Sequence, residues 1–299
     1  MFIGFWGDFD GNNHKIQEIY VNRDNYAGLF GRTQGNPNIK NLEVSGEITA
    51  SLEGNPEGIS AGGIIASYGL SSDDGKIENC VNYAKVTSNG ISGGIVACKA
   101  VGKTLTIANC KNYGEIKGKY VAGGISGQPY SCVNIVNCYN MANVSGGNDF
   151  GYSGISGIAG YVFSTTKIVN CYNIGNIVGY NQAGGMLGYV NWGEHIVENS
   201  YNAGSVSAKT YGGILGGSLI SSELLQIKNA YYLKDKMPTG IGHGPKESEA
   251  NTIPVTLNEI KSQNMVDKLN EYVTENPTKY GIDLKKWKLG ENGYPTFEE

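Results

Sequence analysis

The chain has 299 residues, of which 45 are glycine and only 17% are Asp, Glu, Lys or Arg. An average soluble domain has roughly 25% charged residues, so this composition is typical of a turn-rich all-β protein. The formal net charge of −4 argues against a nucleic-acid partner, which requires a basic surface. All apolar stretches are far shorter than the roughly 20 residues of a membrane span. We therefore expect no membrane span in this segment.

The first residues carry no secretion signal, because Met1–Trp6 leads directly into glycine and aspartate. We expect the signal, any wall anchor and flanking modules of a larger protein to lie outside this segment. The stretch Asp8-Phe-Asp10-Gly-Asn12-Asn13 superficially resembles a calcium loop. The EF-hand pattern needs glycine sixth and glutamate twelfth, whereas these places hold Asn13 and Ile19. We interpret the stretch as a strand and turn that open the array, and predict no metal site.

Two short motifs then recur together seven times along the chain. The first is an aliphatic residue followed two places later by Asn, and its asparagines are 38, 30, 28, 33, 29 and 30 residues apart. The second has the form Gly-aliphatic-x-Gly/Ala and begins at Gly28, Gly63, Gly94, Gly124, Gly157, Gly185 and Gly213. Paired motifs at a steady period indicate a repeat architecture.

Short apolar runs within each repeat decide between helical and β repeats. The runs are interrupted by Gly and Asn, and none keeps the 3.6-residue period of a helix. In one repeat we expect strands over 94–98, 105–108 and 110–117, with a bend at Asn109. Three strands per coil, stacked in parallel about 4.8 Å apart, predict a three-sided, right-handed parallel β-helix. We expect about seven coils of ~30 residues over residues 1–232.

The repeated asparagines are interpreted as structural. Asn tolerates the left-handed backbone of a sharp bend, and its amide can bind the equivalent Asn of the next coil. We therefore predict an asparagine ladder formed by Asn41, Asn79, Asn109, Asn137, Asn170, Asn199 and Asn229. A second asparagine column follows three residues on, at Asn82, Asn112, Asn140, Asn173 and Asn202. A ligand-binding role for these residues is the less favoured alternative.

The repeat resembles that of bacterial surface proteins carrying the GLUG motif. The segments Gly7–Ile16, Ala27–Gly31 and Ile39–Leu42 look like the opening of such an array, and Asn170–Val178 is similar to its repeating unit. The resemblance extends over residues 4–232 and implies a large secreted or wall-attached protein. Some proteins of this kind are attached to a zinc-dependent immunoglobulin-A peptidase. This chain has no His-Glu-x-x-His sequence, so that activity is not implied.

Residues 233–299 are predicted to form a C-terminal cap. Residues 233–256 have the composition of a loop with one short strand. Thr256 and Glu259 fit a capping box, and the apolar spacing that follows predicts one amphipathic helix over about 257–273. Unpaired strand edges at the open end of a solenoid invite association. We therefore expect this segment to fold over that end with its large apolar side chains, Trp287, Leu289, Tyr294 and Phe297.

Four of the six cysteines occupy one repeat position, at Cys80, Cys110, Cys138 and Cys171. Neighbours in such a column point the same way, and no His or carboxylate shares it. Buried free thiols that pack as small apolar groups are therefore favoured over disulfides or a metal site. The column continues at Leu42, Ser200 and Ala230. Whether Cys98 and Cys132, which lie outside it, form a disulfide stays open.

Catalytic side chains do not converge in the repeat pattern. Glu78 is followed in its column by Ala108, Val136 and Val169, so adjacent coils offer no acidic pair. The three histidines, His14, His195 and His243, lie in different regions without an evident Ser or Cys partner. No phosphate-binding glycine loop is present, and we expect no cofactor and no catalytic residue.

The repeat position after the cysteines carries aromatic residues. It holds Val81 and Lys111, and then the tyrosine row, which we define as Tyr139, Tyr172, Tyr201 and Tyr231. If the cysteines point inward, these tyrosines point outward and form an exposed stripe. Structural stacking is the favoured interpretation, and contact with a ligand is the alternative.

The sequence as a whole predicts a non-catalytic module of an extracellular, cell-surface or secreted protein. Such a module acts in adhesion or ligand binding, or as a stalk, and its partners are glycans or proteins of a host or neighbouring cell. The competing hypothesis is a polysaccharide-active lyase or hydrolase, by analogy with other β-helices.

Overall fold

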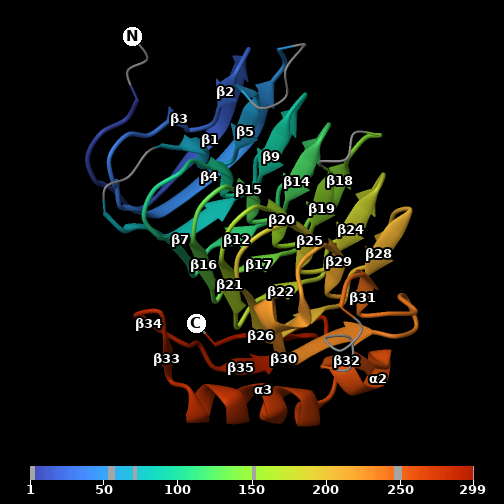
Figure 1. The fold of residues 1–299 in the computed structure, drawn as a ribbon. Coiled ribbons are helices and arrows are strands. Elements are labelled where there is room, and N and C mark those ends of the chain that lie inside the picture. Colours follow the sequence, from blue (N-terminus) through green and yellow to red (C-terminus); the bar gives the residue numbers. More distant parts are fainter. Residues whose placement is uncertain (1–3, 53–57, 70–72, 150–152, 246–250, 299) are drawn as a thin grey trace.

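The computed structural model describes residues 4–52, 58–69, 73–149, 153–245 and 251–298. Strands of successive repeats pair in parallel and form a β-solenoid of about seven turns (Figure 1). The prediction of an all-β β-helix with a small helical cap is confirmed.

Three parallel sheets form the sides of the solenoid in the described residues. The largest, which we call the long sheet, contains β1 (Phe9–Arg23), β4 (Ile39–Ala50), β7 (Gly75–Asn82), β8 (Lys85–Ser88), β11 (Leu105–Ala108), β12 (Lys111–Asn112), β13 (Ile116–Gly118), β16 (Val133–Val136), β17 (Tyr139–Asn140), β18 (Val144–Gly146), β21 (Thr166–Val169), β22 (Tyr172–Asn173), β23 (Ile177–Gly179), β26 (His195–Asn202), β27 (Val206–Ser207), β30 (Leu225–Leu233) and β32 (Thr252–Val255).

The other two sheets are narrower, and each takes one short strand from each coil. The second contains β3 (Phe30–Arg32), β6 (Ile65–Tyr68), β10 (Val96–Lys99), β15 (Ser126–Pro129), β20 (Ala159–Val162), β25 (Leu187–Val190), β29 (Leu215–Ser218) and β31 (Ile241–His243). The third contains β2 (Tyr26–Ala27), β5 (Ser60–Gly62), β9 (Ile91–Gly93), β14 (Val121–Gly123), β19 (Gly154–Ser156), β24 (Gln182–Gly184) and β28 (Thr210–Gly212).

Equivalent residues of successive coils lie opposite one another in the long sheet. Ile77 pairs with Ile107, and the column continues through Ile135, Ile168 and Val197. These five side chains are fully buried and line the interior of the solenoid. Each coil thus places the same apolar group on the coil before it, which fixes the register of the whole stack.

The corner between the third and second sheets depends on glycine. A Cβ added to Gly94 would lie 2.0 Å from the carbonyl oxygen of Gly124 and 2.6 Å from Cγ of Asn112. Asn112 belongs to the second asparagine column, which is buried behind this corner. Its Nδ2 donates to Oδ1 of Asn140 at 2.6 Å and to the Gly114 carbonyl at 3.0 Å. The glycine motif leaves the space that this asparagine column fills.

The chain after Val255 forms the C-terminal segment, residues 256–298. It contains α2 (Leu257–Ile260), α3 (Gln263–Glu275), β33 (Thr278–Lys279), β34 (Ile282–Asp283), β35 (Trp287–Leu289) and β36 (Pro295–Phe297), and a single turn of 3-10 helix, η2 (Ser222–Leu224), precedes it in the last coil. The predicted capping box of Thr256 and Glu259 is present. The predicted single helix is instead two helices, because the Ser262 side chain accepts from the Met265 N–H and caps a new helix.

Residues 233–255 of the predicted cap add β31 and β32 to the last strands of two sheets, and the C-terminal segment that follows packs against the long sheet. It runs back along the outside of the long sheet toward earlier coils (Figure 1). The last long strand, β30, already has β32 as its parallel partner. The aromatic side chains of the segment pack on the tyrosines of the long sheet, where Trp287 lies 5.8 Å and Phe297 5.5 Å from the ring centroid of Tyr172.

Candidate functional site

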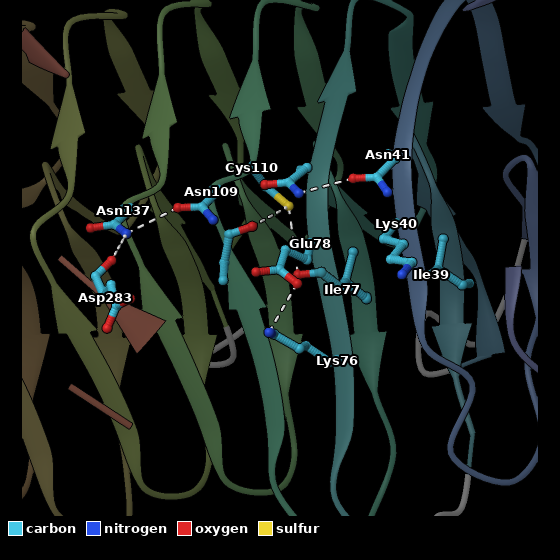
Figure 2. A network of polar contacts seen from close by, with 12 residues as sticks. Ile39, Lys40, Asn41, Lys76, Ile77, Glu78, Asn109, Cys110, Asn137 and Asp283 are labelled. Carbon is cyan, nitrogen blue, oxygen red and sulfur yellow. Dashed lines mark hydrogen bonds and ion pairs between the residues drawn. The ribbon is translucent and has the colours of Figure 1, made fainter. Parts of the chain in front are cut away.

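The asparagine ladder lies at the bends of the long sheet. All seven residues have a positive φ, between 46° and 57°, which is a backbone conformation that asparagine tolerates. Each bonded Nδ2 donates to Oδ1 of the preceding coil, at 2.9 Å (Asn79 to Asn41), 2.9 Å (Asn137 to Asn109), 2.8 Å (Asn170 to Asn137) and 2.8 Å (Asn199 to Asn170). Figure 2 shows part of this column along the solenoid.

Asp10 in β1 continues the ladder at its N-terminal end. Its carboxylate accepts from Nδ2 of Asn41 at 3.0 Å and from the main-chain N–H of Asn12 at 2.9 Å. The bond from Asn12 and then that from Asn41 lower the pKa of Asp10. The neighbouring Asp8 accepts from the Asn38 N–H at 2.8 Å. These carboxylates of the calcium-like stretch therefore join β1 to the next coil.

The ladder is interrupted between Asn79 and Asn109. Among the described residues, Nδ2 of Asn109 has no acceptor and Oδ1 of Asn79 has no donor. Asn79 is exposed and Asn109 is half-buried. At the other end of the ladder, Oδ1 of Asn199 has no partner within the described chain, so Asn229 is not joined to the column.

The C-terminal segment binds the ladder through its main chain. Nδ2 of Asn137 donates to the Asp283 carbonyl at 2.9 Å, and its Oδ1 accepts from the Lys285 N–H at 3.2 Å (Figure 2 shows the first bond). One coil on, Nδ2 of Asn170 donates to the Lys285 carbonyl at 3.0 Å and its Oδ1 accepts from Nε1 of Trp287 at 2.6 Å. The bound chain therefore advances two residues for each coil.

The tyrosine row is stacked but not exposed. Ring centroids are 4.5 Å apart for Tyr139 and Tyr172 and 5.2 Å apart for Tyr172 and Tyr201, with nearly parallel planes. The exposed fractions of the four side chains are 6%, 2%, 0% and 4%. Trp287 and Phe297 lie against the row, and the Tyr201 hydroxyl donates to the Pro295 carbonyl at 2.5 Å. The prediction of an exposed stripe is therefore wrong, because β35 and β36 cover Tyr139, Tyr172 and Tyr201, and Tyr231 is buried beside β32.

A cavity of about 480 Å³ lies where this cover ends. Lys111, Tyr113 and Tyr139 line it from the solenoid. Lys288, residues 290–292 and residues 294–298 line it from the C-terminal segment. The hydroxyls of Tyr113 and Tyr139 are 2.6 Å apart, and the Lys111 ammonium lies 5.7 Å from the Tyr139 ring centroid. Burial raises the pKa of Tyr139, so its phenol stays protonated at neutral pH. The cavity thus offers an aromatic wall with ammonium and hydroxyl donors.

Sequence reasoning missed the exposed aromatic pair beside this cavity. Tyr83 and Tyr113 stack with ring centroids 4.9 Å apart and an angle of 7° between their planes, and both are exposed. Each follows a ladder asparagine by four residues, and this shared spacing was the available signal.

All six cysteines are free, and the four of the cysteine column are fully buried. Each column thiol donates to a main-chain carbonyl within its own coil, as Cys110 does to Ala108 at 3.2 Å. Burial raises the pKa of Cys110 and Cys138, and burial raises that of Cys98 to about 12. Cys98 and Cys132 form no disulfide. The prediction of buried, free thiols in the column is confirmed.

The remaining titratable groups are dispersed. His14, His195 and His243 lie in β1, β26 and β31 respectively. In the part of the chain that the structure describes, no group of three or more His, Cys, Asp or Glu side chains is arranged to hold a metal ion. No helix among those residues is long and apolar enough to cross a membrane. The half-buried Glu198 carboxylate accepts from the Tyr272 hydroxyl and lies 3.2 Å from Nζ of Lys279, and so attaches the C-terminal segment.

Comparison with known proteins defines the class of this protein as a β-solenoid. No family model and no curated protein matches the chain. It is similar to a crystal structure from Bacteroides ovatus described as a putative immunoglobulin A1 protease, with a TM-score of 0.55, 21% identity, and coverage of 89% of this chain and 85% of that chain. At this identity the likeness shows the fold alone. The resemblance to GLUG-motif proteins therefore rests on the repeat residues themselves.

Proposed function

We propose that this chain is a non-catalytic β-solenoid module of a cell-surface or secreted protein, in which it acts as a stalk and as an adhesive surface. The observation that carries the proposal is that the repeated polar side chains bond to one another and to main-chain carbonyls. Both asparagine columns bond along the solenoid axis, and the Cys138 thiol donates to the Ile107 carbonyl of the preceding coil at 3.4 Å. Groups that could perform chemistry elsewhere hold coils together in this molecule.

The C-terminal segment adds support for a mechanical role. It bonds to ladder residues of three successive coils, at Asn137, Asn170 and Asn199. A contact that runs along the axis resists bending and separation of coils. An extended module of this kind suits the display of a surface at a distance from a cell.

The test has two parts. Antibodies raised against the purified protein are applied to intact cells of the organism that encodes it, and the purified protein is applied to arrays of glycans and extracellular-matrix proteins. We expect labelling of intact cells and a saturable ligand on the arrays. Labelling only after the cells are broken would contradict the proposed location.

The enzyme hypothesis is tested on the same preparation. The purified protein is incubated with immunoglobulin A1, because the similar solenoid carries that description, and with acidic and neutral polysaccharides. We expect no cleavage product by mass spectrometry or by a reducing-end assay. Cleavage that copurifies with the folded protein would overturn the non-catalytic proposal.

A further inference from the structure

The contact between the ladder and residues 283–287 shows how this solenoid holds an extended chain. At Asn137 and again at Asn170, the side-chain amide donates to a main-chain carbonyl while the amide oxygen accepts an N–H. Three of these four bonds involve only main-chain atoms of the bound segment. The ladder can therefore bind other sequences in the same way.

The ladder repeats this arrangement two coils earlier, at Asn79 and Asn109. Their φ angles of 53° and 54° match the 53° and 55° of Asn137 and Asn170, so their amides project from the same bend. Within the described residues, Nδ2 of Asn109 and Oδ1 of Asn79 have no partner. These are the donor and the acceptor that the bound segment uses at Asn170 and Asn137 respectively.

If a segment bound two coils earlier in the same way, its residue equivalent to Trp287 would lie at the cavity. Trp287 packs against Tyr172 and Tyr201. The residues two coils before them in the register are Lys111 and Tyr139, and both line the cavity of about 480 Å³. An aromatic side chain placed there would meet the Lys111 ammonium and the Tyr139 ring, a combination that favours aromatic groups.

We propose that the groove formed by Asn79, Asn109 and the adjoining cavity binds an extended polypeptide segment of a partner protein. A partner carbonyl accepts from Nδ2 of Asn109, a partner N–H donates to Oδ1 of Asn79, and an aromatic side chain enters the cavity. This inference rests on the proposed adhesive function and names its class of partner. Continuity with the bound C-terminal segment favours a peptide over a glycan, because the same ladder already binds main-chain groups.

The probe is a fluorescein-labelled peptide with the sequence of residues 281–289, titrated with the full chain and followed by fluorescence anisotropy. Asn109→Gly removes the amide but keeps a residue that tolerates positive φ, and Asn229→Gly is the matched control at the unjoined end of the ladder. We expect Asn109→Gly to weaken binding about tenfold, the loss of roughly one hydrogen bond. Asn229→Gly should change the affinity by less than about twofold, since distant sites act independently.

Two altered peptides test the geometry of the bound segment. Lys285→Pro in the peptide removes the N–H that would donate to Asn79, and Trp287→Ala removes the anchor for the cavity. Both should bind more weakly than the parent peptide. In 15N-asparagine-labelled protein, the side-chain NH2 signals of Asn109 should shift on addition of the peptide, whereas those of Asn229 should not. This measurement locates the site even if a variant is less stable.

The outcomes separate this inference from the proposed function. If the peptide does not bind, or binds Asn109→Gly as well as the native chain, the peptide groove is wrong. An array ligand found in that case leaves the adhesive function standing. A glycan that binds the native chain but not Asn109→Gly would assign the groove to carbohydrate and overturn the peptide as its occupant. Cleavage of the probe would overturn the non-catalytic function instead.

Discussion

Each ladder asparagine has a backbone role and a side-chain role. The positive φ turns the strand at the bend, and the amide joins neighbouring coils or the C-terminal segment. Asn137 and Asn170 each combine four contacts. The amide of Asn137 bonds to Asn109, Asn170, Asp283 and Lys285. The stability of the solenoid therefore depends on the ladder asparagines, because each combines a left-handed backbone with side-chain amide bonds.

Replacement of Asn137 by Ala should lower the free energy of unfolding by about 2–4 kcal/mol, because a left-handed alanine is strained and several hydrogen bonds are lost. Asn137→Gly removes the same bonds without the strain and should cost about 1 kcal/mol less. Urea unfolding followed by circular dichroism measures both. Asn229→Ala, which loses no ladder bond, should cost only the strain. A loss below about 0.5 kcal/mol for Asn137→Ala would contradict the assigned bonds.

His195 gives the stability a specific pH dependence. Burial lowers its pKa to about 4 from the 6.5 of an exposed histidine, so between these values the unfolded chain binds a proton that the folded chain does not. Stability is therefore full above pH 6.5 and falls as the pH drops toward 4, with a loss from this group of about 2 kcal/mol between pH 7 and 5. His195→Leu, which matches Leu225 in the next coil, should reduce this loss. If the same drop in pH shifts the urea midpoint of the native chain and of His195→Leu equally, the assignment of this pH dependence to His195 is contradicted.

At the scale of elements, the C-terminal segment packs against the outside of the long sheet without adding a strand to it. Its two antiparallel strand pairs and α3 place Trp287, Phe297 and Tyr272 against coils that lie far away in sequence. The tyrosine row thereby becomes part of a shared aromatic core. Trp287 is central, being 1% exposed and bonded to Asn170 and Asn270.

Trp287→Ala should lower the free energy of unfolding by about 3–5 kcal/mol, the usual cost of removing a large buried aromatic side chain. It should also loosen residues 276–298, because the main support of this segment on the tyrosine row is lost. Limited proteolysis with mass spectrometry would then find new cuts in that range while the solenoid stays intact. Unchanged proteolysis would mean that the ladder bonds alone hold the segment.

For the whole molecule, stability varies along the axis. Among the described residues, the N-terminal strand β1 pairs only with β4, and it is mostly exposed. The coils from Asn137 to Asn199 have neighbours on both sides and carry the C-terminal segment. In a stack where each coil depends on its neighbours, the covered coils should open least often.

Hydrogen exchange should follow this order. Amides of β1 and β4 should exchange fastest, and amides of β16, β21 and β26 slowest. Mass spectrometry of peptic fragments measures the profile in the native chain, and Trp287→Ala should narrow the difference between the ends. Uniform protection along the solenoid would instead indicate a single cooperative unit.

Much of this architecture follows from local sequence, because each coil contacts the next copy of itself. The spacing of Ile77, Ile107 and Ile135 determines the register, and Asn109 needs only its own φ and its neighbours to form a bend. The inward cysteines follow from the alternation of a strand. These features repeat, so seven copies of the pattern specify them.

The covering of the tyrosine row follows from contacts that do not repeat. Asn137 and Asp283 are 146 residues apart in the chain, and no periodic pattern connects them. Alternation correctly turns Tyr172 away from the cysteines, yet its exposure depends on whether Trp287 and Phe297 pack over it. The same packing leaves Asn79, Asn109 and the cavity uncovered. Periodic stacking is encoded residue by residue, whereas one long-range apolar contact determines which part of the surface remains open to a partner.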